Sequence, residues 1–240
     1  MRIFVAGAAG AIGRRLLPML VVAGHEVTGT TRSIERASTI ALTGAKVAVV
    51  DAFDTVALSD AVAESRAQVV IHQLTDLTVL PGETLGEIEI ARNARLRTLG
   101  TANLVEAAAA CGAVRVIAQS LAWLYPPGPE PHAESDTLET PGEEPSMTLS
   151  AVMSMERAVT TDDRFEGVVL RLGRLYGPGT WTDHPLEAPT VHVDAAAWAT
   201  LLAVELAGTA VYNIADDGGP VTITRAREDL GWMPEFRAPD

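Results

Sequence analysis

Three glycines near the start of the chain have the spacing of a turn that holds phosphate. Gly7, Gly10 and Gly13 follow a short apolar run and precede an apolar helical pattern. The first would permit a tight turn off a strand, the second a close approach of the backbone to a diphosphate, and the third close packing of helix on strand. The helix N-terminus would offer free N–H groups to the phosphates. We therefore expect dinucleotide binding, with a purely structural turn as the alternative. The expected cofactor-binding residues of the turn are Gly7, Ala9, Gly10, Ala11, Ile12 and Gly13.

The residues after the second predicted strand bear on which dinucleotide is bound. A site for NAD places Asp or Glu there, to accept a hydrogen bond from the ribose 2′-hydroxyl. The chain has Thr31 and Arg32 instead, and its next acid is Glu35. Arg32 could meet a 2′-phosphate through a charge-assisted hydrogen bond. We therefore expect NADP(H) to be favoured over NAD(H), and the alternative is that Arg32 is solvated at a helix start.

Polar residues follow the third and fourth predicted strands as well. The Asp51 carboxylate, next to Ala52, could accept from the adenine amino group, or it could be an ordinary loop aspartate. The backbone after the fourth strand is expected to run beneath the ribose and diphosphate of the cofactor. That stretch contains the expected cofactor-binding residues Gln73, Leu74 and Thr75.

Ser120 and Tyr125 follow the fifth predicted strand, where catalytic side chains lie in parallel sheets of this kind. Their hydroxyls are candidates to hydrogen-bond a substrate carbonyl or hydroxyl, and Ser120 is also a candidate to contact the cofactor. The alternative is that Ser120 caps the strand and Tyr125 packs under the loop that follows.

The elements that would position these residues alternate between strand and helix patterns. Strands are predicted at residues 2–6, 26–30, 46–50, 69–73, 114–119, 168–172 and 210–214. Helices are predicted at residues 11–23, 33–42, 54–64, within 84–111, and at 148–160, 194–206 and 224–230. Ser33, Asp54 and Asp194 are expected to cap helices. This alternation predicts an α/β fold with a doubly wound parallel sheet in the order 3-2-1-4-5-6.

Composition and charge limit the classes of partner. The net charge is -13, which argues against nucleic acid and anionic membrane as partners. Cys111 is the one cysteine, so no internal disulfide is expected and a reducing, cytoplasmic location is favoured. No apolar run has the length of a membrane span, and we expect no metal site.

Seven segments together resemble the short-chain dehydrogenase/reductase superfamily, and most of all its extended, NAD-dependent epimerase/dehydratase branch. They lie at residues 7–13, 69–75, 99–112, 114–125, 170–179, 191–199 and 229–236. The resemblance implies a Rossmann-type core over residues 1–172 and a small substrate-binding lobe over residues 173–240. It also implies that the final strand and helix could pack back on the core, and that the helices within 84–111 and at 148–160 could form a homodimer contact.

The family's catalytic pattern is missing from this sequence. The family pairs a Tyr, as acid and base, with a Lys four residues later that binds the nicotinamide ribose. Matching Glu156 to the family's Glu places Thr148 at the Tyr position and Val152 at the Lys position. Because Lys46 is the only lysine, no arrangement of the chain can supply the motif.

Further departures suggest other polar contacts. An Asn that the family carries before its Gly-Thr pair is replaced by Arg97, a candidate for the cofactor or substrate site. With Arg92 and Arg95 it could hold an anionic or carbonyl group, or the three could form a solvated helix face. The candidates for substrate contact are Asp76, Trp123, Thr148, Arg174, Trp181 and His184.

Three functions are compatible with these patterns, each with a small-molecule ligand. The first is an NADP(H)-dependent oxidoreductase or epimerase-like enzyme with a non-standard catalytic set. The second is a non-redox isomerase, cyclase or dehydratase on the same fold. The third is a binding protein that senses NAD(P)H. The intact glycine turn favours the first and third, whereas the missing Tyr and Lys weaken the first.

Overall fold

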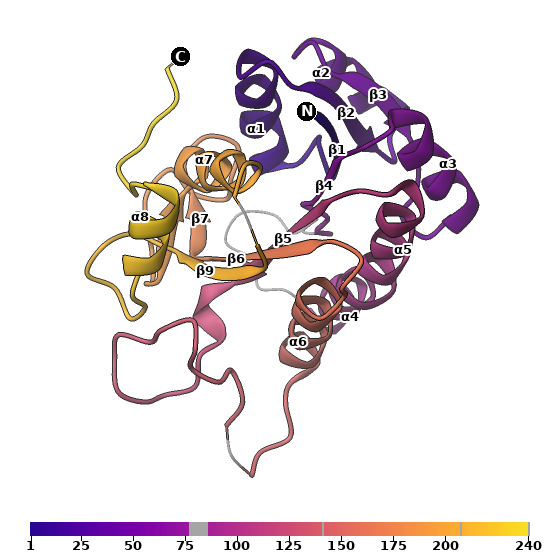
Figure 1. The fold of residues 1–240 in the computed structure, drawn as a ribbon. Helices are drawn as coiled ribbons and strands as arrows, with labels where there is room; N and C mark the ends of the chain where they lie inside the picture. The colour runs from indigo at the N-terminus through magenta and orange to yellow at the C-terminus, as the bar shows by residue number, and fades with distance from the viewer. Residues whose placement is uncertain (77–85, 141, 207, 240) are drawn as a thin grey trace.

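A seven-stranded parallel sheet forms the centre of the computed structural model (Figure 1), which describes all residues except 77–85, 141, 207 and 240. The strands are β1 Arg2–Ala6, β2 Glu26–Thr31, β3 Lys46–Val49, β4 Val69–His72, β5 Arg115–Leu121, β6 Glu166–Leu172 and β9 Ala210–Ile214. Their order is β3-β2-β1-β4-β5-β6-β9, and every neighbouring pair is parallel. The predicted doubly wound order is thereby confirmed, and β9 extends the sheet beyond β6.

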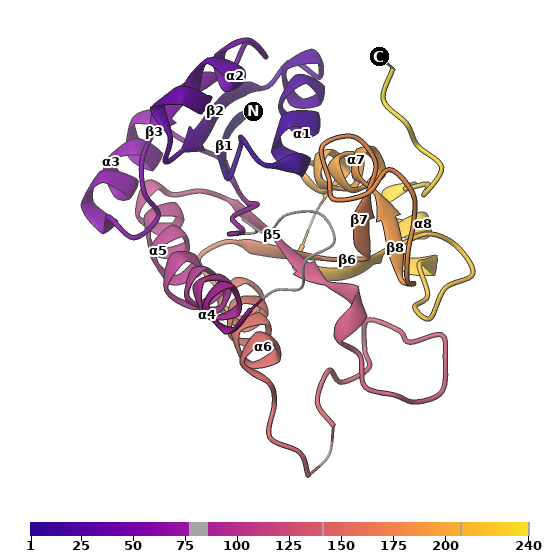
Figure 2. The same ribbon diagram turned by 180° about the vertical axis from the view of Figure 1, so that it is seen from behind.

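Helices cover both faces of this sheet (Figures 1 and 2). One face carries α1 Ala11–Val22, α2 Ala37–Ala41, α7 Val193–Ala203 and α8 Thr224–Leu230. The other carries α3 Thr55–Ser65, α4 Glu87–Arg95, α5 Thr101–Cys111 and α6 Met147–Thr160. The central strands are consequently apolar on both sides, and Val69, Val70 and Ile71 of β4 have no exposed surface.

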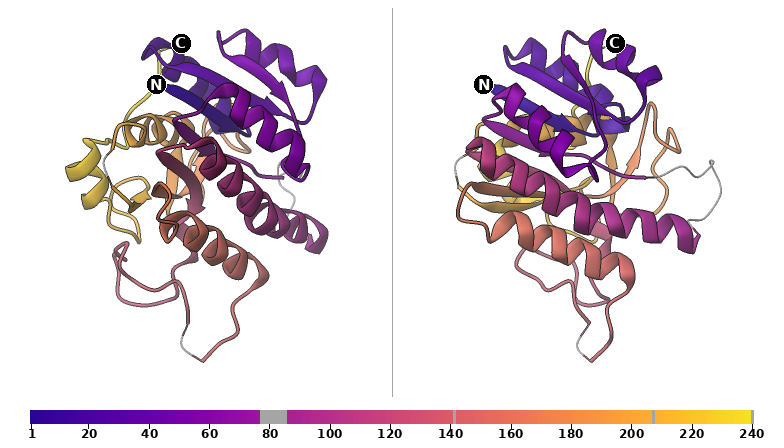
Figure 3. Two further views of the ribbon diagram at one scale, coloured as in Figure 1. Left: turned by 45° about the vertical axis from the view of Figure 1, so that its right-hand side comes forward. Right: turned by 90° about the vertical axis from the view of Figure 1, so that its right-hand side faces the viewer.

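The long helix predicted within residues 84–111 is interrupted by a π-helical turn. This turn, η2 Leu96–Gly100, joins α4 to α5, and α6 packs alongside (Figure 3). The helix ends at Gly112, whose φ of 74° is left-handed, as the sequence predicts. The predicted earliest start, at residue 84, lies outside the described residues.

The helix starts agree with the sequence at one position and differ at two. Asp54 caps α3 by accepting a hydrogen bond from the N–H of Ala57 at 3.0 Å, as predicted. Ser33 does not cap a helix, because its hydroxyl bonds to the Glu35 side chain and the short helix η1 Ile34–Arg36 comes first.

The prediction that Asp194 caps the next helix is also wrong. The cap of α7 is His192, whose ring accepts from the N–H of Asp194 at 3.2 Å. The Asp194 carboxylate instead accepts two hydrogen bonds from Arg15 of α1, at 2.5 and 3.1 Å. A guanidinium from a distant helix attracts this carboxylate more strongly than neutral backbone N–H groups do.

A two-stranded parallel sheet lies beside the core. It consists of β7 Arg174–Tyr176 and β8 Thr190–His192, with irregular chain between them. The chain then returns through α7 to β9, which hydrogen-bonds to β6. Among the described residues, no helix combines the length and apolar character that spanning a membrane requires.

Candidate functional site

The glycine turn joins β1 to α1 and passes very close to the end of β4. Gly7 has a φ of 86°, and a Cβ built on it would lie 2.5 Å from the carbonyl oxygen of Gln73. A Cβ on Gly13 would lie 2.4 Å from the carbonyl oxygen of Ala8. Both positions therefore require glycine, for the turn and for helix packing respectively.

The N-terminus of α1 opens at this turn without a side-chain cap. Gly10 occupies the N-cap and donates its own N–H to the carbonyl of Gly7 at 3.0 Å. Its carbonyl accepts from the N–H of Arg14 at 3.0 Å, but as a glycine it has no side-chain oxygen to cap the first N–H groups. Ala11, Ile12 and Gly13 form the first turn behind it. A helix N-terminus whose first N–H groups have no side-chain cap is suited to bind an anion.

A cavity lies at the carboxyl ends of β1, β2, β3 and β4, against the glycine turn. Ten of the expected cofactor-binding residues line it: Gly7, Ala9, Gly10, Thr31, Arg32, Asp51, Ala52, Gln73, Leu74 and Thr75. Arg36 and Leu96 line it as well, although sequence reasoning did not single them out. The spacing of Arg32 and Arg36, four residues apart at a helix start, was the signal that could have identified Arg36.

One buried acceptor in this cavity has no partner. Gln73 donates from Nε2 to the Thr200 hydroxyl at 3.4 Å, whereas its Oε1 accepts no hydrogen bond in the described part of the chain. An unsatisfied buried acceptor costs on the order of 1–3 kcal/mol. A ligand hydroxyl or amide would remove that cost. The orphaned oxygen, the glycine turn and the uncapped helix therefore fit a bound dinucleotide.

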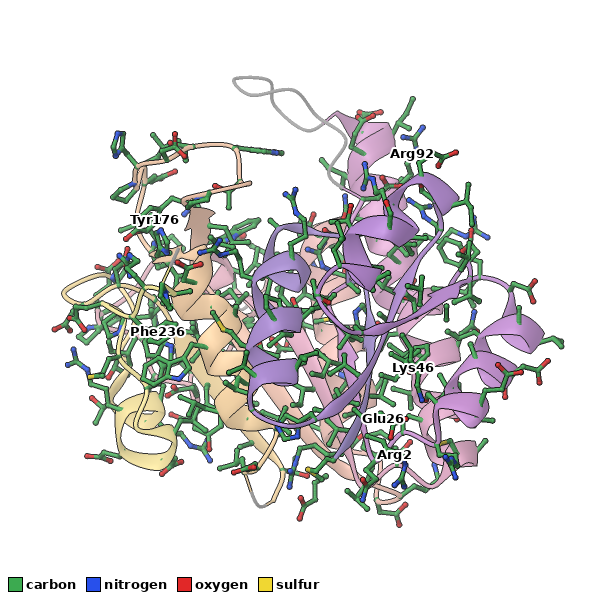
Figure 4. The ribbon with its side chains drawn as sticks, turned by 90° about the horizontal axis from the view of Figure 1, so that it is seen from above. Arg2, Glu26, Lys46, Arg92, Tyr176 and Phe236 are labelled. Atoms are coloured by element: carbon green, nitrogen blue, oxygen red, sulfur yellow. The ribbon has the colours of Figure 1, made fainter. Side chains whose placement is uncertain are left out.

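A second cavity continues from the first along α4. It is lined by Arg32, Asp51, Phe53, Asp76, Arg92, Arg95 and Leu96. Arg32 and Asp76 face each other at 3.8 Å, and the Arg95 guanidinium lies 4.1 Å from the centre of the Phe53 ring. In Figure 4, Arg92 and Tyr176 lie toward the top, whereas Arg2, Glu26 and Lys46 mark the opposite, amino ends of the strands.

A buried histidine, His72, is the last residue of β4. His72 accepts at Nδ1 from the N–H of Leu74 at 3.2 Å, so its Nε2 donates to the Thr101 hydroxyl at 2.9 Å. Burial, with the charge of Arg97 as the second cause, lowers the pKa of His72 to about 4. His72 is therefore neutral near pH 7. Arg97 itself is half-buried on η2.

Ser120 and Tyr125 lie in a buried network rather than in either cavity lining. Ser120 has no exposed surface, and its hydroxyl donates to the Glu156 carboxylate at 2.5 Å. Arg171 of β6 donates to both oxygens of Glu156 and also to the Tyr125 hydroxyl at 2.7 Å. Tyr125 in turn donates to Asn213 of β9 at 2.9 Å. Burial raises the pKa of Tyr125 despite the neighbouring Arg171, which makes its phenol a weaker acid.

An apolar cluster stands between β5 and α6. Its buried members are Leu121 at the end of β5, Val152 of α6 and Leu138 of the intervening loop. Thr148 lies half-buried one turn before Val152.

The remaining candidates for substrate contact divide into two groups. Trp123 and Arg174 meet, with the guanidinium 5.1 Å from the ring centre, and Arg174 also faces Glu187 at 3.4 Å. Trp181 and His184 are exposed in the chain between β7 and β8. Across the described residues, no three His, Cys, Asp or Glu side chains gather as metal ligands would.

Residues 3–197 match the NAD dependent epimerase/dehydratase family. The chain belongs to this family. A relative from a Streptomyces species, the 3-diazoavenalumate denitrifying reductase, is 38% identical over 242 residues, which cover 90% of this chain and 76% of the relative. This epimerase/dehydratase-family chain thus has a reductase as a homologue.

Solved structures of epimerases share the fold. The UDP-glucose 4-epimerase of Thermotoga maritima, with UDP-glucose, has a TM-score of 0.79 at 20% identity, over 99% of this chain and 94% of its own. The enzyme WbmG of Bordetella bronchiseptica, in complex with NAD, has a TM-score of 0.75 at 18% identity, over 99% and 90%.

The sequence comparison predicts Val152 at the position of the family's Lys. Val152 is buried against Leu121 and Leu138. Lys46, the only lysine, is ion-paired with Glu26 at the opposite end of the strands (Figure 4). The predicted Lys position thus lies among apolar side chains.

Proposed function

We propose that the chain is an NADPH-dependent reductase whose substrate group is already strongly electrophilic, of the aryl diazonium class. The observation that carries this proposal is the apolar cluster of Leu121, Leu138 and Val152 in a chain whose glycine turn is intact. The turn favours a bound dinucleotide, whereas the cluster leaves no lysine to assist an acid.

The cofactor would be held by groups on three strand ends. The uncapped N-terminus of α1 would receive the diphosphate. The Gln73 Oε1 would gain a donor, and the Asp51 carboxylate, which also accepts from the N–H of Phe53 at 2.9 Å, would face the adenosine half. A reduced nicotinamide supplies a hydride when bound.

A diazonium acceptor would explain why no acid is needed. A carbonyl that receives hydride becomes an alkoxide and requires a proton, which is the role of the family's Tyr. An aryl diazonium is a cation, so hydride and diazonium give the arene and dinitrogen with no proton from the protein. The relative at 38% identity is named for denitrifying reduction of a diazo compound, which supports this substrate class.

Two arginines favour the phosphorylated cofactor. Arg32 and Arg36 both line the first cavity at the end of β2, where a carboxylate would mark an NAD site. The Arg32 side chain is about half exposed and 3.8 Å from Asp76, so it is free to reorient toward a 2′-phosphate. The related solved structures contain NAD, and the preference for NADP(H) therefore rests on these side chains alone.

Isotope transfer tests the proposal. Protein would be incubated with NADPH deuterated at C4 and with 4-carboxybenzenediazonium, beside a protein-free control and a panel of aldehydes and ketones. We expect deuterium on the arene carbon and one dinitrogen per NADPH, faster than in the control, with carbonyls left unreduced. Saturable NADPH binding without such transfer would favour a sensor, and absence of both would favour a non-redox enzyme.

The same family resemblance supports a homodimer. We propose that α4, α5 and α6 of two copies pack together, since these helices already lie side by side on one face (Figure 3). Sedimentation equilibrium would show a dimer mass if this is correct.

A further inference from the structure

Arg97 differs from the other poorly exposed arginines in having no partner among the residues that the structure describes. Arg15 binds Asp194, Arg115 pairs with Glu166, and Arg171 binds Glu156. Arg97 is half-buried, yet within the described residues it has no hydrogen bond, ion pair or ring contact. Its positive charge is therefore unmatched in the described part of the protein.

Arg97 lines neither cavity, but it directly follows Leu96, which lines both. It lies on the π-helical turn η2, which packs against α6, the helix that carries Val152 (Figure 3). Its charge reaches the buried His72, and the next residue after His72 is Gln73, which lines the first cavity. π-helical turns occur frequently at functional sites.

An unpaired, partly desolvated guanidinium is unfavourable in the free protein. Burial lowers the pKa of Arg97, although a guanidinium keeps its proton at any ordinary pH. Arg binds carboxylates through two parallel hydrogen bonds, and such a pair repays the desolvation that each ion alone would suffer. An anionic group of a ligand could therefore form an ion pair with the Arg97 guanidinium.

We propose that Arg97 is the receptor for a carboxylate of the bound substrate. This inference rests on the proposed function, since the substrate is that of the reductase. The cofactor's diphosphate has the same chemistry, but the N-terminus of α1 already offers it N–H groups. The carboxylate is therefore the better match, and the experiment separates the two anions.

Equilibrium binding of an unreactive probe tests the proposal without turnover. Benzoate and neutral benzamide would be titrated by calorimetry into protein saturated with NADP⁺, for the wild type, Arg97→Gln and Arg97→Lys. The matched control is Arg157→Gln, which removes one exposed charge from the last turn of α6. We expect wild type and control to bind benzoate but not benzamide, Arg97→Gln to lose about tenfold or more in affinity, and Arg97→Lys to retain part of it.

The affinity for NADP⁺ and the thermal stability show whether Arg97 binds the substrate, binds the cofactor or stabilises the fold. NADP⁺ affinity should stay within about twofold in Arg97→Gln, because tenfold corresponds to loss of a charged contact. The midpoint of thermal unfolding without ligand should be unchanged or higher, because an unmatched charge has been removed. Four results would each overturn the proposal. Two concern benzoate: equal affinity for wild type and Arg97→Gln, or no binding to wild type. The other two concern Arg97→Gln: a selective loss of NADP⁺ affinity, or a lower midpoint of thermal unfolding. None of these results depends on hydride transfer, so they are separable from failure of the proposed function.

Discussion

Both carboxylate oxygens of Glu156 accept hydrogen bonds from Arg171, at 3.0 and 2.7 Å. The pair joins α6 to β6, and each partner is about nine-tenths buried. Ser120 of β5 and Tyr125 attach to it through their hydroxyls. The network thus ties α6 to the carboxyl ends of β5 and β6.

Removing one member of this pair should lower the free energy of unfolding strongly. Glu156→Ala leaves the Arg171 guanidinium buried without its counter-ion, at a cost of about 3–5 kcal/mol in the free energy of unfolding. The control Glu106→Ala breaks the exposed pair with Arg164, which solvent screens, and should cost much less. Urea denaturation of both variants measures the difference, and equal losses would contradict the buried role.

The hydroxyls of Ser120 and Tyr125 are expected to support structure more than turnover. Ser120→Ala and Tyr125→Phe each remove a hydrogen bond to a charged group, worth about 1.5–3 kcal/mol of stability. The kcat of either variant should stay within about tenfold of wild type, below the contribution of a general acid. A loss of kcat near a thousandfold without a change in stability would place that hydroxyl on the substrate.

Gly7 should be irreplaceable for cofactor binding. Gly7→Ala combines a left-handed backbone with a Cβ 2.5 Å from the Gln73 carbonyl, so the turn must shift and NADPH affinity should fall at least about tenfold. Gly24→Ala is the matched control, because Gly24 has nearly the same φ of 85° and nothing within 4 Å of its Cβ. Fluorescence titration with NADPH should separate the two variants, since only the first disturbs the cavity.

Cofactor preference should depend on the arginines at the end of β2. Arg32→Ala and Arg36→Ala each remove a charged donor facing the first cavity. We expect NADPH affinity to fall about 10- to 100-fold for the residue that holds the 2′-phosphate, since hydrogen bonds to charged groups contribute about 1.5–3 kcal/mol. NADH affinity should hardly change. Parallel loss of both cofactors would contradict a 2′-phosphate site.

Acid should destabilise the fold through His72. Its pKa falls from 6.5 to about 4 on folding, so the unfolded chain binds the proton that the folded chain excludes. This contribution is complete above pH 6.5 and is lost as pH falls from 6.5 to 4, by about 3 kcal/mol in total. The pH dependence of unfolding should be shallower in His72→Gln over that window. At pH 8 the same variant should lose only the hydrogen bonds of the ring with Thr101 and Leu74. A pH slope equal to that of wild type would contradict the assignment.

The parts of the structure that follow from local pattern could be predicted from the sequence. The order of the first six strands follows from alternation and handed crossovers. The glycine turn follows from the spacing of Gly7, Gly10 and Gly13, and Asp54 caps α3 because an adjacent N–H is its best partner.

The structure differs from the sequence prediction where a residue distant in the sequence binds a side chain or strand in place of a local partner. Asp194 is drawn to Arg15, which is 179 positions away, and so leaves the cap to His192. Strand β5 continues two residues beyond its predicted end, because Ser120 and Leu121 pair with Arg171 and Leu172 of β6. Periodicity in one segment carries no information about such partners.

The π-helical turn at Leu96–Gly100 gives this helix an unusual tolerance of a change in length. Each residue of an α-helix advances the chain by about 100° around its axis, so a deletion inside regular helix rotates the residues before it by that angle. A π-helical turn is wider and takes up one extra residue, so deleting one residue there would restore regular helix with α4 and α5 in nearly the same relative orientation. Arg92 and Arg95 would then stay in the second cavity. Among homologues, a one-residue gap at this turn would therefore be compatible with the same binding surface.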